Sequence, residues 1–238
     1  MSAQKRGLEP FLERDFRVYE RHRQDDDEYN ALRLNVRRKL KAIADETKKA
    51  AKAEGYTLDA MAGLHHPYSF NNFRVREQRA YLCRGAGERK KLASFFGEAL
   101  GKDAETHYIQ TVLEVSIDAQ VVEAALRIHP QAWWDGENLK KQVATPEGMA
   151  EWIANLKSLP PGFGLRMHDW KKIYWAGSVS RQEMEEYFGT YTPGEHWLHL
   201  VRELPHEDAV EMGDDGPRWV VASLLALLPT WKSILWMP

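Results

Sequence analysis

Apolar residues recur at three- and four-residue steps in residues 25–54, which predicts one long helix. The acidic residues 25–28 suit a helix N-terminus, and Gly55 is placed to end the helix. The predicted buried stripe comprises Tyr29, Leu32, Val36, Leu40, Ile43 and Thr47. On the adjoining flank we expect a solvated basic ridge of Arg33, Arg37, Lys41, Lys48 and Lys52.

Strand patterns follow this helix. Residues 64–84 predict a hairpin or strand pair, because turn-like residues precede an alternation of apolar and polar side chains at 73–76. Residues 107–117, rich in Val, Ile and Leu, predict the firmest strand. The alanines of residues 121–129 also suit a helix, and we assign a strand to the second half of that run. Short strands are expected at 165–167 and 173–175.

Further helices are predicted at 88–100, 135–143 and 146–157, with another one capped by Ser178 or Ser180. The last helix starts near residue 214 and is apolar almost all round from 219 to 228. Pro229 ends or kinks it, and together with Lys232 it interrupts a stretch barely long enough to span a membrane. We therefore expect a buried core helix.

These elements predict an α+β fold. In this fold, a central and mostly antiparallel sheet packs with helices, including the long N-terminal helix and the buried C-terminal one. No repeat or linker marks a domain boundary, so we expect a single domain over residues 1–238 with a possible minor seam at 160–164.

Composition adds a compartment and a charge asymmetry. Cys83 is the only cysteine and no apolar run follows the N-terminus, which favours the cytoplasm. Residues 1–101 hold 21 Lys and Arg against 15 Asp and Glu, whereas residues 102–238 hold 12 against 20. This asymmetry predicts either a basic face that meets phosphate or two halves that attract each other within the fold.

Arginines and aromatic residues alternate in the basic half. Arg74, Arg76 and Arg79 lie close to Phe70 and Phe73, a mixture that holds phosphates and stacks bases but is also ordinary on a sheet surface. Neither of the two common glycine-rich nucleotide-binding loops is present.

Two further clusters contain residues that can carry chemistry. Arg127, His129, Trp133, Trp134 and Asp135 follow a predicted strand end, where ligands often bind. The two tryptophans line a pocket in one interpretation and only pack the core in the other.

Arg166 and His168 form the other cluster, in which His168 is a candidate acid or base. Asp169, Asp135 and Glu195 are equally plausible partners that would orient its imidazole. With His129 and Asp135, His168 completes the predicted catalytic set.

A metal site is the last alternative considered. His196 and His199 share a face only if they lie on a helix, and no third ligand stands at a recognisable spacing. We expect no metal and no cofactor, with structural histidines at these positions.

Three phrases, His129 to Gly136, Met167 to Lys172 and Tyr191 to Trp197, resemble an uncharacterised family of bacterial proteins of similar length. The resemblance implies a bacterial source and an α+β fold, and it implies no activity.

Three functions remain open, and the sequence does not decide whether the protein is an enzyme. The first is binding of nucleic acid or a nucleotide along an N-terminal basic surface made by Arg33, Arg37, Lys41, Arg74, Arg76 and Arg79. The second is a small-molecule enzyme whose pocket gathers Arg127, His129, Asp135, Arg166 and His168. The third is a scaffold or partner subunit that exposes an apolar surface.

Overall fold

The computed structural model describes residues 7–96, 108–168 and 170–236. In this part of the chain seven strands form one antiparallel sheet in the order β1-β2-β3-β4-β7-β5-β6. The strands are β1 (Leu58–Ala62), β2 (Gln78–Arg84), β3 (Val112–Ile117), β4 (Val121–Ile128), β5 (Phe163–Met167), β6 (Tyr174–Trp175) and β7 (Leu198–Pro205). The predicted α+β class with its antiparallel sheet is confirmed.

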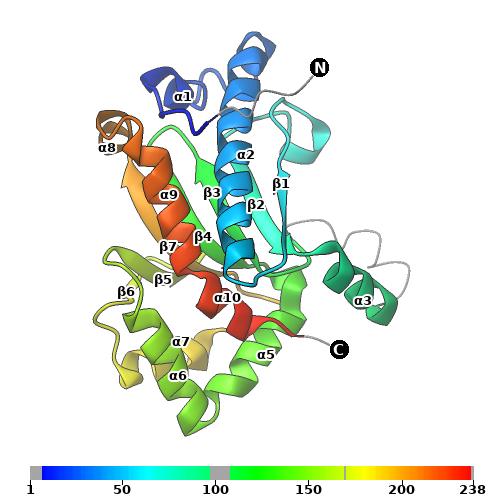
Figure 1. Cartoon of the computed structure of the whole chain (residues 1–238), viewed down its shortest axis with the longest axis vertical. Helices are drawn as coiled ribbons and strands as arrows, with labels where there is room; N and C mark the ends of the chain where they lie inside the picture. The colour runs from blue at the N-terminus through cyan, green and yellow to red at the C-terminus, as the bar shows by residue number, and fades with distance from the viewer. Residues whose placement is uncertain (1–6, 97–107, 169, 237–238) are drawn as a thin grey trace.

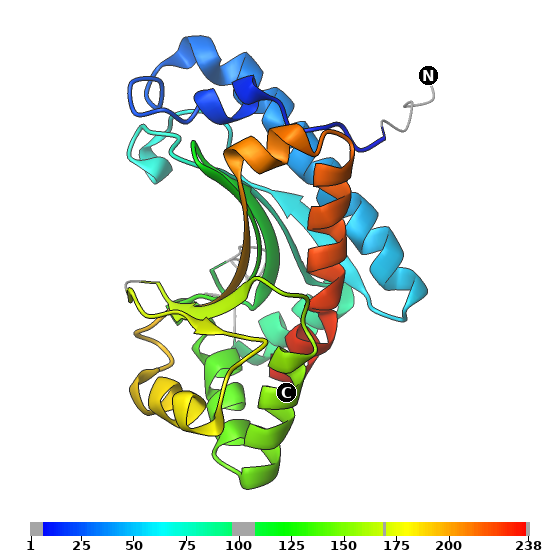
Figure 2. The ribbon, with the colours of Figure 1, turned by 90° about the vertical axis from the view of Figure 1, so that its left-hand side faces the viewer.

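The sheet curves, and helices cover its convex face (Figures 1 and 2). The longer α-helices are α2 (Asn30–Ala53), α3 (Ala86–Phe96), α5 (Trp133–Val143), α6 (Pro146–Lys157), α7 (Arg181–Thr190) and α9 (Asp215–Ala226). The short ones are α1 (Glu13–Arg17), α8 (His206–Glu211) and α10 (Leu228–Ile234). α2 and α9 lie side by side against β1 to β4, while the concave face opens on the other side of the sheet.

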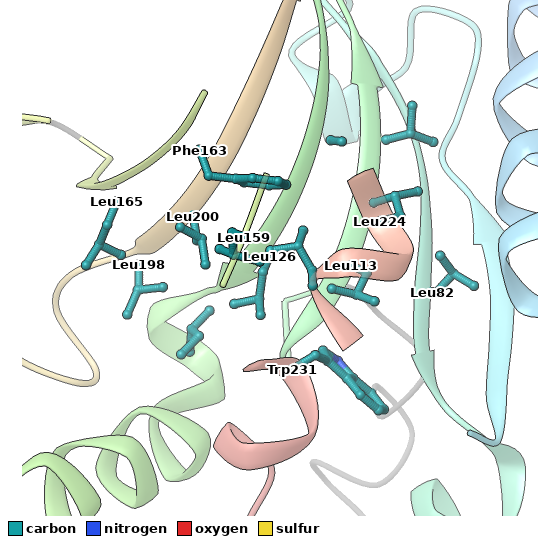
Figure 3. Packing of buried hydrophobic residues seen from close by; sticks show 14 of the residues in the cluster. Leu82, Leu113, Leu126, Leu159, Phe163, Leu165, Leu198, Leu200, Leu224 and Trp231 are labelled. Atoms are coloured by element: carbon teal, nitrogen blue, oxygen red, sulfur yellow. The ribbon is translucent and has the colours of Figure 1, made fainter. Parts of the chain in front are cut away.

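Alternation along the strands assigns one set of side chains to the convex face and the core. Leu82, Leu113, Leu126 and Leu200 point toward α9 and α10, where they pack with Leu224 and Trp231 (Figure 3). Pro229 stands in the first turn of α10, so the predicted apolar helix is divided in two at this point. No helix in the described part of the chain has the length and apolar character needed to cross a bilayer.

The basic ridge predicted on the long helix is wrong at Arg33, which is fully buried. Its two Nη atoms donate to the carbonyl oxygens of Arg23 and Asp26 and to the side chain of Asn30, whereas its Nε has no hydrogen-bond partner among the described residues. The helix itself is confirmed, although α2 begins at Asn30 after a short 3₁₀ turn, and Gly55 follows it with φ of +87°.

Three strand predictions need correction. Residues 73–76 form a loop rather than a strand, because Asn72 and Phe73 both adopt positive φ and Phe73 N–H turns back to the carbonyl of Tyr68. The strand predicted over 107–117 begins only at Val112, and residue 107 lies outside the described residues. Conversely, β4 occupies nearly all of the run 121–129, and its two alanines lie on opposite faces, Ala124 in the core of the convex face and Ala125 on the concave side.

The predicted helix 88–100 corresponds to α3, whose described end is Phe96, so residues 97–100 lie outside the described part. Phe95 on this helix is 61% exposed. Ser180 caps α7 through a reciprocal capping box with Glu183, as one of the two predicted caps.

Candidate functional site

The concave face of the sheet carries charged side chains at the positions that alternate with the core. Arg127 of β4 stands beside His199 of β7, and His199 in turn stands beside Arg166 of β5, so three neighbouring strands place two arginines and an imidazole in one row. In the register of β3 and β4, Ser116 lies opposite Glu123. Glu114 lies two residues before Ser116 on β3, and therefore on the same face of the sheet. Strand register therefore assembles the site from three separate segments of the chain, the β3–β4 hairpin, β5 and β7.

Ion pairs join these side chains into one network. Arg127 contacts Glu123 and lies 3.0 Å from Glu114, a carboxylate that is completely buried. Arg166 extends the network to Glu123 at 3.2 Å and to Glu203 at 3.1 Å. At the other end, Arg79 lies against Glu77 and 3.9 Å from Glu114. The network therefore holds its guanidinium groups in fixed positions across the sheet.

Aromatic and imidazole rings form the wall next to this network. The ring of Trp197 lies 4.2 Å from that of His129 and about equally far, 5.5 and 5.3 Å, from those of His168 and His199. Tyr108 packs edge-on against His129 at 4.6 Å. The loops that leave β4 and β5 and the loop that enters β7 supply these rings, so they meet at one end of the strands.

Two of the imidazoles are held in the neutral form. Burial lowers the pKa of His199 well below its ordinary value, and the nearby Arg127 lowers it further. Burial, helped by Arg79, lowers the pKa of His129 to about 4. At neutral pH both rings therefore offer one N–H donor and one acceptor nitrogen.

The ring of His199 has an unused nitrogen. The residue is only 5% exposed, and none of the described residues forms a hydrogen bond with its Nε2. Buried polar atoms nearly always form a hydrogen bond. A bound molecule or a water molecule would therefore account for the unpaired Nε2 of His199.

The network and the rings line a hollow of about 470 Å³, here named the central cavity. Its described lining includes Arg79, Arg127, Arg166, His168, Trp197 and His199. A second hollow of about 540 Å³, the loop cavity, lies between β1, β2 and the loop 63–77, and it shares Glu77, Arg79 and Tyr108 with the central cavity. Both volumes fall in the range of small-molecule sites.

The structure brings together most residues of one predicted pocket. Arg127, Arg166 and His168 line the central cavity, and His129 contacts the Trp197 and Tyr108 rings of its wall. Of the predicted phosphate-binding arginines, Arg79 lines both cavities, whereas Arg74 and Arg76 line the loop cavity.

Asp135, predicted to be catalytic, lies apart from this cavity. It is fully buried at the start of α5, where it accepts two hydrogen bonds from the Arg84 guanidinium and others from Thr111 and from the backbone N–H of Trp236. These bonds use its lone pairs, so the geometry gives Asp135 a structural role.

The two tryptophans predicted to bind ligand divide between packing and exposure. Trp134 is 4% exposed and packed, while Trp133 is half exposed near Gly194. Neither lines the central or the loop cavity.

The histidines weighed as metal ligands do not share a face. His196 precedes β7 and its Nδ1 accepts a hydrogen bond from the Thr192 N–H, while His199 lies within the strand. In the described part of the chain, no cluster of three or more His, Cys, Asp or Glu side chains could hold a metal ion.

Sequence reasoning missed Glu114, Glu123 and Trp197. A charged residue inside an apolar strand was the available signal, because Glu114 interrupts a run of Val and Leu. Both faces of β3 are buried, so a charged side chain on this strand costs free energy unless an oppositely charged group pairs with it.

Comparison with protein-family models and with curated proteins finds no match for the chain. The chemistry of the site itself therefore has to carry the functional proposal.

Proposed function

We propose that the central cavity binds a small molecule through an oxyanion, either a carboxylate or a phosphate. Arg166 carries the proposal. Its guanidinium has five N–H donors, and its contacts with Glu123 and Glu203 occupy only two of them. The side chain is 27% exposed and lines the cavity, so its remaining donors are available to a ligand.

His199, which lies beside Arg166 on the adjacent strand β7, supports the same assignment. A neutral imidazole whose Nε2 carries the proton donates to an acceptor oxygen without bringing a second positive charge. The three arginines of the lining meet Glu77 and Glu123 within it and also Glu114 and Glu203 beside it, so the preference for an oxyanion rests on the remaining donors of Arg166 and not on net charge.

Binding of nucleic acid along α2 has less geometric support. Arg33 is buried, Arg37 donates to the carbonyl oxygens of Ala62 and Gly63, and Lys41 pairs with Asp45. These three contacts occupy side chains that a phosphate backbone would need.

The proposal is tested by titrating ¹⁵N-labelled protein with inorganic phosphate and, separately, with acetate. We expect the Trp197 indole N–H and the His199 ring signals to shift with saturation, and Arg166→Gln to weaken binding about tenfold, the value of one charge-assisted contact. Arg218→Gln is the matched control, because Arg218 is exposed and pairs only within α9. Absence of shifts with both anions, or equal binding by Arg166→Gln, would overturn the proposal.

A further inference from the structure

The central cavity and the loop cavity adjoin at Glu77, Arg79 and Tyr108, which belong to the linings of both hollows. The chemistry differs between the two hollows. The central cavity is lined by ion pairs and imidazoles, whereas Met61, Leu64, Phe70 and Tyr81 give the loop cavity an apolar wall.

Much of the apolar wall is exposed to solvent, and a bound molecule would cover it. Phe70 is 68% exposed and Leu64 46% exposed, although both line the hollow. The ring of Phe70 lies 6.2 Å from that of Tyr108, which also reaches the central cavity. Exposed apolar side chains gathered around a hollow mark a ligand-binding surface.

The loop that presents Phe70 is held in a costly conformation. Asn72 and Phe73 both have positive φ, 54° and 56°, which is rare for a bulky residue such as Phe. The side chain of Asn71 fixes the turn, because its Oδ1 accepts from the Tyr68 N–H and its Nδ2 donates to the carbonyl of His66. The fold thus maintains this conformation against its backbone strain.

We propose that the ligand is an elongated anion with an aromatic ring at the end opposite its oxyanion. Its ring occupies the loop cavity, where aromatic side chains and the guanidinium of Arg74 or Arg76 offer faces for stacking. Its oxyanion binds Arg166 and His199, so this inference rests on the function proposed above.

The sheet sets the length of the ligand. Arg166 stands on β5 and Arg79 on β2, four strand spacings apart in the order β2-β3-β4-β7-β5. At about 4.8 Å per spacing the two backbones are roughly 19 Å apart, and the inward-reaching side chains shorten the gap. A spacer of several methylene groups between ring and oxyanion therefore fits better than a single one.

A series of ω-phenylalkanoates tests the inference by the same titration. Acetate, phenylacetate, 4-phenylbutyrate and 6-phenylhexanoate share one carboxylate and differ in reach. We expect 6-phenylhexanoate to bind at least tenfold more tightly than acetate, and at least threefold more tightly than hexanoate and 6-cyclohexylhexanoate. Phe70→Ala should remove most of the gain from the ring and leave acetate binding unchanged. Phe73→Ala is the matched control, because Phe73 is an equally exposed ring of the same loop outside the lining.

The outcomes separate the two proposals. Binding of acetate that depends on Arg166, with no gain along the phenyl series, would overturn this inference and leave the proposed function in place. Equal losses in Phe70→Ala and Phe73→Ala, or equal affinity for phenyl and cyclohexyl compounds, would also overturn it. If none of the carboxylates and no phosphate binds, the proposed function fails and this inference fails with it.

Discussion

At the scale of single residues, the buried charges divide into those that hold the fold and those that face the cavity. Arg84 and Asp135 are both fully buried on the core side and satisfy each other, with Trp231 packed nearby through its N–H bond to the carbonyl of Thr111. Glu114 is equally buried but pairs with Arg127 at the base of the concave face. Each pair joins an arginine to an acidic residue, and the two pairs lie on opposite sides of the sheet.

Removing the charge of Asp135 should destabilise the protein strongly. Asp135→Asn leaves the Arg84 guanidinium buried without a counter-charge, and we expect the free energy of unfolding to fall by about 3–5 kcal/mol. Urea unfolding followed by circular dichroism measures the change. Asp215→Asn, in an exposed pair with Arg218, should change stability by less than about 0.5 kcal/mol. A similarly small effect for Asp135→Asn would contradict the structural role.

The lowered pKa of His129 predicts a loss of stability in acid. His129 has a pKa of about 4 in the folded protein, below its ordinary value of 6.5. As pH falls below 6.5 the unfolded chain takes up a proton that the folded chain refuses, so this contribution is complete above pH 6.5 and is lost toward pH 4.

His129→Gln should therefore make stability less sensitive to pH. Between pH 7 and 5 we expect the wild-type free energy of unfolding to fall about 1 kcal/mol more than that of the variant, roughly half the full linkage value because the ring is only partly buried. Urea unfolding at both pH values provides the measurement. Parallel losses in the two proteins would mean that His129 is not held neutral.

At the scale of elements, helix ends and close approaches decide where side chains are tolerated. Gly148 stands in the first turn of α6, where an added Cβ would overlap the carbonyl of Gln142, a backbone atom with little room to move. Gly189 lies near the end of α7, and a Cβ there would meet nothing within 4 Å. A close backbone contact thus requires glycine at position 148, whereas no contact requires it at position 189.

Replacing each glycine with alanine tests this difference. Gly148→Ala should lower the free energy of unfolding by about 2 kcal/mol or more through the backbone overlap. Gly189→Ala should raise it by up to about 1 kcal/mol, because alanine has the higher helix propensity. Thermal and urea unfolding of both variants gives the comparison, and effects of the same sign would contradict the account.

At the scale of the whole molecule, one sheet ties distant parts of the chain together. β7 pairs with β4 on one side and with β5 on the other, so the sheet continues across residues 160–164, where the sequence shows its only break. α9 returns from the C-terminal part to pack against β3, β4 and α2, and α10 packs against α5 and α6.

This connectivity predicts that the chain unfolds as one cooperative unit. Tryptophan fluorescence and far-ultraviolet circular dichroism should report the same urea midpoint and the same slope, because separating residues on either side of 160–164 breaks the shared sheet. Two distinct midpoints would show that the part after 164 unfolds independently.

The sequence by itself determined the class of fold and the longer helices, but it predicted no strand at β1 and left helix and strand open at β7. The periodicity of α2, the capping of α6 and α7 and the apolar run divided by Pro229 are local features, and local spacing is enough to predict them. The β-branched and aliphatic residues of 107–117 likewise identified a strand, although β3 begins only at Val112 and β4 extends beyond the half of 121–129 that was assigned as a strand.

Only the tertiary structure decided which charges meet. Arg127 and Asp135 were expected in one pocket because they flank a predicted strand end, yet Arg127 pairs with Glu114 on the concave face while Asp135 pairs with Arg84 in the core. Antiparallel register then brings His199 and Arg166 beside Arg127 from segments far along the chain. Pairing across strands depends on long-range register, which no local pattern encodes, so the cavity emerged only when the sheet was assembled.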